Sequence, residues 1–195
     1  MDADGLTIAC ATVAELKAAR RAGLPAALIG LGGSRGLPEG RLVSFGLAGA
    51  LRDGLACGTV LDAVRVVDPA GETLWSGPPL GVSGAREATI LAAEEIVDEP
   101  AERRALHERT GADAADLESG PLARTGRLAG CLRVVSDTPA RPLNGIAEAV
   151  KPGGSIDWLG LAKAFVRAPL GFARAASDGR RALGALGGAA EGLAG

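Results

Sequence analysis

Short apolar runs alternate with segments of helical periodicity through the first two thirds of the chain. Apolar stretches of this length suit strands that are buried in a sheet. They predict strands at Leu6–Ala11, Ala26–Leu31, Arg41–Phe45, Thr59–Val67 and Gly130–Ser136. Helical spacing predicts helices at Thr12–Arg21 and Pro100–Thr110, whereas Ala88–Val97 fits either element and Ala114–Ala123 begins as a strand or turn and becomes helical. This alternation is typical of an α/β protein.

From Trp158 onward the pattern of apolar residues changes. Apolar residues recur at helical spacing around Pro169, which predicts two packed helices over Trp158–Val166 and Phe172–Leu186, with a frayed end at 187–195. We therefore divide the chain into an α/β domain, 1–157, and a helical extension, 158–195, that packs on it. The extension is interpreted as a cover for the sheet or a subunit interface; because it carries Lys163, Arg167, Arg174, Arg180 and Arg181, peripheral membrane contact is the alternative.

Composition and charge narrow the functional classes. The net charge of −2 and the 3% of aromatic residues argue against a nucleic-acid-binding protein. No apolar run approaches the ~20 residues that span a bilayer, and the first residues do not resemble a signal peptide, so we expect a cytoplasmic protein. Cys10, Cys57 and Cys131 are interpreted as buried reduced thiols, and His107, the one histidine, as part of a solvated helix face. We predict no metal site.

Two glycine-rich segments follow predicted strands. Ile29–Gly36 contains G-x-G-x-x-x-G, the kind of loop that holds a dinucleotide when it opens a helix. The next residues, Leu37–Gly40, are too short for a helix, so a turn or a loop touching another anion is favoured and dinucleotide binding is the weaker alternative. Gly46–Leu51 is predicted as a turn whose glycines let a ligand lie against bare backbone.

Acidic residues occur at two ends of predicted strands. Asp116-Leu117-Glu118-Ser119 lies where a strand changes to a helix, and Ser136-Asp137 ends the last strand. In α/β sheets, ligands bind beyond the carboxyl ends of strands. Each carboxylate also has a structural interpretation: Asp116 as an N-cap, Glu118 as a partner of the helix dipole and Asp137 as a turn residue.

Taken together and in order, Gly46–Leu51, the DLES motif and the RVVSD motif at 133–137 resemble the nucleoside phosphorylase/nucleosidase superfamily, which cleaves the N-glycosidic bond of nucleosides. The chain looks most like the hopanoid-associated branch, through Ile96–Ser119, LRVVSD and the basic tail. The resemblance implies a three-layer α/β sandwich around a central mixed sheet with a C-terminal helical tail. It also implies a homodimer or higher homo-oligomer, and a 5′-modified adenosine, with adenosylhopane as the candidate, as substrate.

The resemblance also implies roles for individual residues. Glu15 would activate the attacking water, Glu118 would hydrogen-bond the ribose hydroxyls, and Asp137, supported by Ser136, would give a proton or a hydrogen bond to N7 of the purine. No cofactor is implied, and phosphate is the alternative co-substrate to water. The remaining substrate contacts that it implies are Ala48, Gly49, Ile96, Val97 and Leu117.

The chemistry of the bond agrees with this assignment. A leaving purine needs an acid and an attacking water needs a base. A carboxylate facing the ribose binds the cationic transition state more tightly than the substrate. For Asp137 to hold or share a proton at neutral pH, we expect apolar surroundings.

Three departures from the family keep an alternative open. Ser34–Gly40 is too short for the crossover helix that ordinarily separates these strands. Ile96 stands at a position that is often aromatic in relatives, and Ser44 stands where some phosphorylases carry an arginine. The missing cation favours water over phosphate, with Arg35 or Arg52 as its possible replacements. A non-catalytic nucleoside-binding relative is therefore the second hypothesis.

Overall fold

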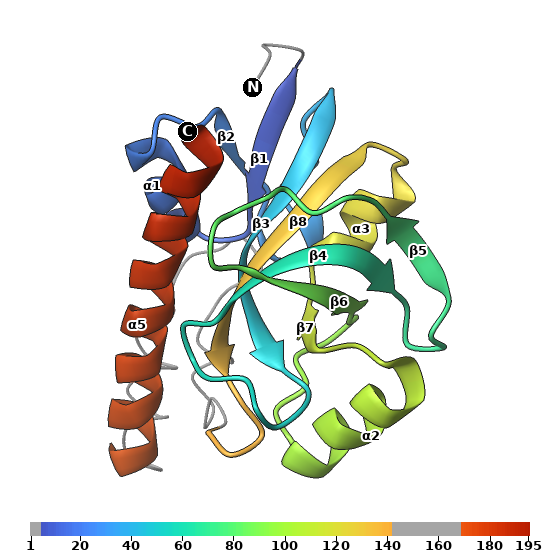
Figure 1. Cartoon of the computed structure of the whole chain (residues 1–195), viewed down its shortest axis with the longest axis vertical. Helices are drawn as coiled ribbons and strands as arrows, with labels where there is room; N and C mark the ends of the chain where they lie inside the picture. The colour runs from blue at the N-terminus through green and yellow to red at the C-terminus, as the bar shows by residue number, and fades with distance from the viewer. Residues whose placement is uncertain (1–4, 142–168) are drawn as a thin grey trace.

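The computed structural model describes residues 5–141 and 169–195 and shows a mixed α/β fold (Figure 1). Eight strands form one sheet, and helices cover it on both faces. The strands are β1 (Leu6–Cys10), β2 (Ala26–Leu28), β3 (Arg41–Ala50), β4 (Val60–Val67), β5 (Thr73–Ser76), β6 (Arg86–Ala92), β7 (Ala114–Asp116) and β8 (Leu128–Asp137). The helices are α1 (Val13–Arg21), the 3₁₀ turn η1 (Leu31–Gly33), α2 (Pro100–Thr110), α3 (Ser119–Arg124) and α5 (Pro169–Ala194).

The sheet is mixed and closes on itself. Strands β2, β1, β3 and β8 lie side by side and parallel, and β8 pairs antiparallel with β4 on its other side. Strand β4 continues through β6 to β7, and β7 returns to the last residues of β3, at Gly49 and Ala50. Strands β3, β8, β4, β6 and β7 therefore form a ring, which brings the ends of β3, β6, β7 and β8 to one opening.

Successive side chains of a strand point to opposite faces of the sheet and pack in two separate apolar clusters. Ile8 and Cys10 of β1 point into a cluster with α1 and α5, whereas Ala9 between them points into a cluster with α3. Helix α2 packs on a third, smaller cluster through Leu106. The expected three-layer arrangement around a central mixed sheet, with a C-terminal helix, is confirmed.

Most of the elements predicted from periodicity are present, and the differences concern a glycine-rich segment, an edge strand and the C-terminal helix. Helix α2 has the predicted bounds because Pro100 suits the first helical position and Gly111, with φ of 69°, ends the helix. The glycine-rich segment Gly46–Leu51 was predicted as a turn, and this is wrong: residues up to Ala50 continue β3. Ala88–Val97 resolves into the end of β6 and a loop, and the short edge strand β5 was not predicted.

The connection from β2 to β3 is made without a helix. Both strands are parallel to β1 and flank it, so the chain crosses over within residues 29–40. The turn η1 and glycines with positive φ, such as Gly36 at 90°, make this short path possible. The predicted absence of a crossover helix between β2 and β3 is correct. Strands β2 and β3 are nevertheless both parallel to β1.

The C-terminal helix differs from its prediction. Helix α5 runs from Pro169 to Ala194 along one face of the sheet (Figure 1), and the end predicted to fray is helical and docked, with Leu193 buried. The predicted helix at Trp158–Val166 lies outside the described residues, as do Lys163 and Arg167. Among the helices of residues 5–141 and 169–195, none has the length and apolar character needed to cross a membrane.

The docking of α5 can be tested by a core truncation. Leu186 is fully buried against the sheet, so we expect Leu186→Ala to lower the free energy of unfolding by about 3 kcal/mol through lost contacts and a residual cavity. Urea denaturation measures the change. Arg180→Ala, on the exposed face of the same helix, is the control and should change stability by less than about 0.5 kcal/mol. Equal small effects would show that α5 is not part of the core.

Candidate active site

A cavity of about 260 Å³ lies at the opening of the ring of strands, beside the start of α1. It receives the carboxyl ends of β1, β3 and β8, together with the ends of β6 and β7. This is the edge at which ligands bind in α/β sheets. All nine residues singled out from the sequence line it: Glu15, Ala48, Gly49, Ile96, Val97, Leu117, Glu118, Ser136 and Asp137.

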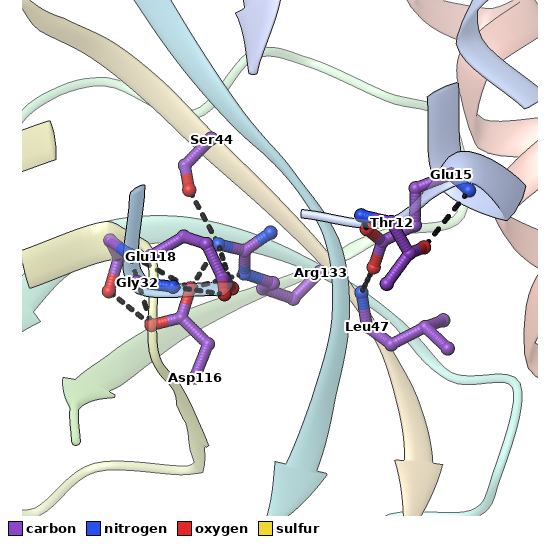
Figure 2. Close-up of polar contacts among 9 residues, drawn as sticks. Thr12, Glu15, Gly32, Ser44, Leu47, Asp116, Glu118 and Arg133 are labelled. Carbon is purple, nitrogen blue, oxygen red and sulfur yellow. Dashed lines mark hydrogen bonds and ion pairs between the residues drawn. The ribbon is translucent and has the colours of Figure 1, made fainter. Parts of the chain in front are cut away.

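Glu15 is held at the first turn of α1. It forms the predicted capping box with Thr12, whose backbone N–H donates to Oε2 at 2.7 Å. The N–H of Leu47 on β3 donates to Oε1 at 2.9 Å, which ties the helix to the sheet (Figure 2). The side chain is 4% exposed. Burial raises the pKa of Glu15, and these two N–H groups and the more distant Arg133 oppose that shift.

Glu118 follows β7 and faces the opposite side of the cavity. Its Oε1 accepts a hydrogen bond of 3.1 Å from the N–H of Gly32 in η1, and its Oε2 lies 3.8 Å from the Arg133 guanidinium (Figure 2). Burial raises its pKa to about 8; the charge of Asp116 adds to that shift and Arg133 opposes it. The glycine-rich loop Ile29–Gly36 thus supports a carboxylate, and no helix follows it to hold a dinucleotide.

Asp116 belongs to a buried ion pair that was not predicted from the sequence. Arg133 of β8 donates to Asp116 through Nε at 2.6 Å and through a second guanidinium nitrogen, which also contacts Ser44. Ser119 donates to the same carboxylate through its N–H and hydroxyl. The prediction of Asp116 as an N-cap is wrong, because Glu118 is the N-cap residue of α3. The sequence did offer one sign of this pair: Arg133 stands in an otherwise apolar stretch of the predicted strand, and a buried charge needs a partner.

Asp137 lies in an ion pair as well, with Arg103 of α2. Ser136 donates to its other oxygen, Oδ1, at 2.5 Å. Asp137 and Arg103 are 3% and 1% exposed. The expectation of apolar surroundings for Asp137 is therefore wrong, because a guanidinium group lies beside the carboxylate. Arg103 was not predicted as a site residue, because in the sequence it looks like one more charge on a charged helix.

The glycines of β3 lie against carboxylate side chains. A Cβ built on Gly49 would lie 2.9 Å from Oδ2 of Asp137 and 3.4 Å from the Arg103 guanidinium. One built on Gly46 would collide with the Glu15 carboxylate and approach Arg133 at 3.1 Å. Both positions therefore need glycine for close approach of a charged side chain, and ligand contact with the backbone of Gly46–Leu51 stays a prediction.

The wall of the cavity beside the loop after β6 is apolar. Ile96 is 43% exposed, an unusual exposure for a large aliphatic side chain, and Val97 is half-buried. A second, more open hollow of about 510 Å³ adjoins this wall and shares Leu31, Ala93, Glu95, Ile96 and Leu117 with the first. Exposed Glu94 and Arg124 border the second hollow, and exposed Glu95 lines both.

The other residues named from the sequence have structural surroundings. Cys10, Cys57 and Cys131 are free and buried as predicted, and burial raises the pKa of all three thiols. His107 is half-buried, not fully solvated, and its Nδ1 lies 2.7 Å from the carbonyl oxygen of Ala112. Within residues 5–141 and 169–195, no group of three or more His, Cys, Asp or Glu side chains is arranged to hold a metal ion.

The fold matches that of solved nucleosidases. The chain is similar to the 5′-methylthioadenosine/S-adenosylhomocysteine nucleosidase from Neisseria meningitidis, with a TM-score of 0.63 and 14% identity, covering 97% of this chain and 98% of that one. It is also similar to the corresponding nucleosidase from S. pneumoniae, with a TM-score of 0.62 and 14% identity, covering 96% of this chain and 99% of that one. For futalosine hydrolase of Helicobacter pylori, the TM-score is 0.57 and the identity 14%, and the match covers 94% of this chain and 96% of that one. No protein-family model and no curated protein matches the sequence. At this identity the likeness establishes the fold.

The raised pKa of Glu118 predicts how stability depends on pH. The folded chain holds this proton up to about pH 8, whereas the unfolded chain releases it near 4.5, so the free energy of unfolding falls as pH rises through this range. We expect Glu118→Gln to reduce that fall, measured by urea denaturation at several pH values. Glu102→Gln, an exposed position on α2, should leave the slope unchanged. An unchanged slope in Glu118→Gln would contradict the assignment.

Proposed function

We propose that the protein hydrolyses the N-glycosidic bond of a purine nucleoside and releases the free base. One observation carries the proposal: Glu15, Glu118 and Asp137, from three separate elements, are buried and line one cavity. Burying carboxylates is costly, and such clusters occur where their charges do chemical work. The likeness in fold to proteins named nucleosidase and hydrolase supports the same activity.

Each carboxylate suits one part of the reaction. Asp137, with Ser136 beside it, would meet N7 of the purine and give it a proton or a hydrogen bond as the C–N bond breaks. Glu118, anchored by the Gly32 N–H, would in its ionised form accept hydrogen bonds from the ribose hydroxyls, which become more acidic as positive charge develops on the sugar. Glu15, whose pKa burial raises, would take the proton of the attacking water.

The surroundings of the cavity favour water over phosphate as the nucleophile. Among the described residues that line it, the cation is Arg103, which is already paired with Asp137. Ser44 contacts Arg133 instead of facing an anion, and Arg52 pairs with Asp113 at 2.6 Å. Neither Arg35 nor Arg52 lines the cavity. A phosphate dianion would need a free cation there.

The open hollow beside the cavity supports a substituent on the 5′ carbon. It is continuous with the wall formed by Leu31 and Leu117, next to the Glu118 carboxylate that would hold the ribose. A substituent leaving the ribose on that side has room without displacing the core. We propose a 5′-modified adenosine as the substrate, with adenosylhopane as the candidate that the sequence resemblance favours.

A nucleoside-binding protein without catalysis is the second candidate. The observation that favours it is Ile96, an exposed aliphatic residue where an aromatic ring would stack on the base. Release of adenine from adenosine, methylthioadenosine and an adenosyl-lipid analogue, followed by chromatography with and without phosphate, separates the candidates. Release without phosphate supports hydrolysis, and release only with phosphate indicates a phosphorylase. Binding seen by calorimetry without release supports the non-catalytic protein.

The role of Asp137 gives a direct prediction. Asp137→Asn keeps the shape of the side chain but cannot donate an acidic proton, so we expect kcat for adenine release to fall at least about a hundredfold. Steady-state kinetics measure the loss, and circular dichroism checks the fold. Asp113→Asn, which alters an ion pair that does not line the cavity, is the matched control and should retain activity. Unchanged turnover in Asp137→Asn would overturn the proposed role.

A further inference from the structure

Arg103 is a buried charge that the roles assigned above do not use. It projects from α2 into the wall of the cavity and is 1% exposed. Its Nε donates to the carbonyl oxygen of Val97 at 2.8 Å, and one terminal nitrogen donates to that of Ala50 at 3.2 Å. The other terminal nitrogen contacts Asp137 and lies 3.4 Å from Asp98. One guanidinium group therefore joins the loop after β6, the end of β3 and the end of β8.

These contacts fix the carboxyl group of Asp137 from one side. Gly49 leaves space for Oδ2 and for the guanidinium that binds it, since a Cβ there would crowd both groups. The planar fork of arginine is what allows one side chain to serve a carboxylate and two carbonyl oxygens at once. Lysine would keep the charge and lose this geometry.

Ser136 completes the arrangement from the other side. Its hydroxyl lies 2.5 Å from Oδ1 of Asp137 and 3.2 Å from the carbonyl oxygen of Ala48. A hydroxyl has one proton to donate. It donates to the ionised carboxylate of Asp137, and it can turn to the carbonyl oxygen of Ala48 when the carboxyl group carries the proton that it gives to N7. Ser136 and Arg103 therefore contact the two oxygens of the same carboxyl group from opposite sides.

We infer that Arg103 is a positioning residue for departure of the base, acting through Asp137; this role rests on the proposed function. As the C1′–N9 bond breaks, its electron pair goes to the purine and the proton of Asp137 passes to N7. Water adds its oxygen to C1′ and gives a proton to Glu15. The carboxylate left on Asp137 is the ionised partner that the guanidinium binds more strongly. Arg103 therefore stabilises the transition state more than the bound substrate.

The test compares two leaving groups. The purine of adenosine or methylthioadenosine departs with help at N7, whereas 4-nitrophenolate departs from 4-nitrophenyl ribofuranoside without a proton. We expect Arg103→Gln to lower kcat for adenine release by about a hundredfold, while release of 4-nitrophenolate changes by less than about threefold. Arg103→Lys should recover about tenfold of the loss, because it restores the charge without the fork.

Two controls separate this role from a structural one. Arg104→Gln changes the neighbouring arginine of α2, which is 48% exposed and pairs with Asp53, and should leave both activities unchanged. The double variant Arg103→Gln/Asp137→Asn removes both buried charges, so it avoids an unpaired carboxylate that destabilises the fold. If the two residues act as one unit, its kcat for adenine release equals that of Asp137→Asn within about threefold.

Equal losses for the two leaving groups, or losses that multiply in the double variant, overturn the role of Arg103 and leave the proposed function intact. Full activity of Arg103→Gln on nucleosides also overturns the role of Arg103 and leaves the proposed function intact. Absence of base release by the unaltered protein overturns the proposed function and this role with it. A loss confined to nucleosides, partly recovered by lysine, establishes the role.

Discussion

The pairing of buried carboxylates with two buried arginines is the interaction on which the rest of the structure depends. Glu15, Asp116, Glu118 and Asp137 line one cavity and are each less than a tenth exposed. Unpaired, their charges would oppose folding, because desolvating a carboxylate is costly and like charges repel. Arg133 and Arg103, each 1% exposed, make the arrangement compatible with a folded chain.

The two arginines lie at different distances from the four carboxylates, so the carboxylates have different surroundings. Arg133 is bound most closely by Asp116, and Glu118 lies 3.8 Å from the guanidinium. Burial and the charge of Asp116 raise the pKa of Glu118, and Arg133 opposes that shift. Glu15 has backbone N–H partners but no close cation among the described residues. Groups of one type placed in unlike surroundings can serve as acid, base and hydrogen-bond acceptor at the same pH.

The strand β3 explains how charged side chains of distant segments meet. Its glycines Gly46 and Gly49 leave room beside the backbone for Glu15 with Arg133 and for Asp137 with Arg103. A side chain at Gly46 would displace the Glu15 carboxylate, and one at Gly49 would displace the Asp137–Arg103 ion pair. The same strand pairs with β1, β8 and β7, so it brings together the elements that carry the carboxylates.

Local sequence pattern by itself determines much of this protein. The capping box of Thr12 and Glu15, the bounds of α2, and the placing of DLES and Ser136-Asp137 at strand ends follow from short-range geometry. Of these residues, Thr12, Glu15, Asp116, Leu117, Glu118, Ser136 and Asp137 line the cavity. The closing of the sheet, the use of Gly46 and Gly49, and the partners of Arg103 and Arg133 were decided only by tertiary structure. The physical reason is that an ion pair joins residues far apart in the chain, as Arg103 and Asp137 are, and neither residue's neighbours in sequence carry a sign of its partner.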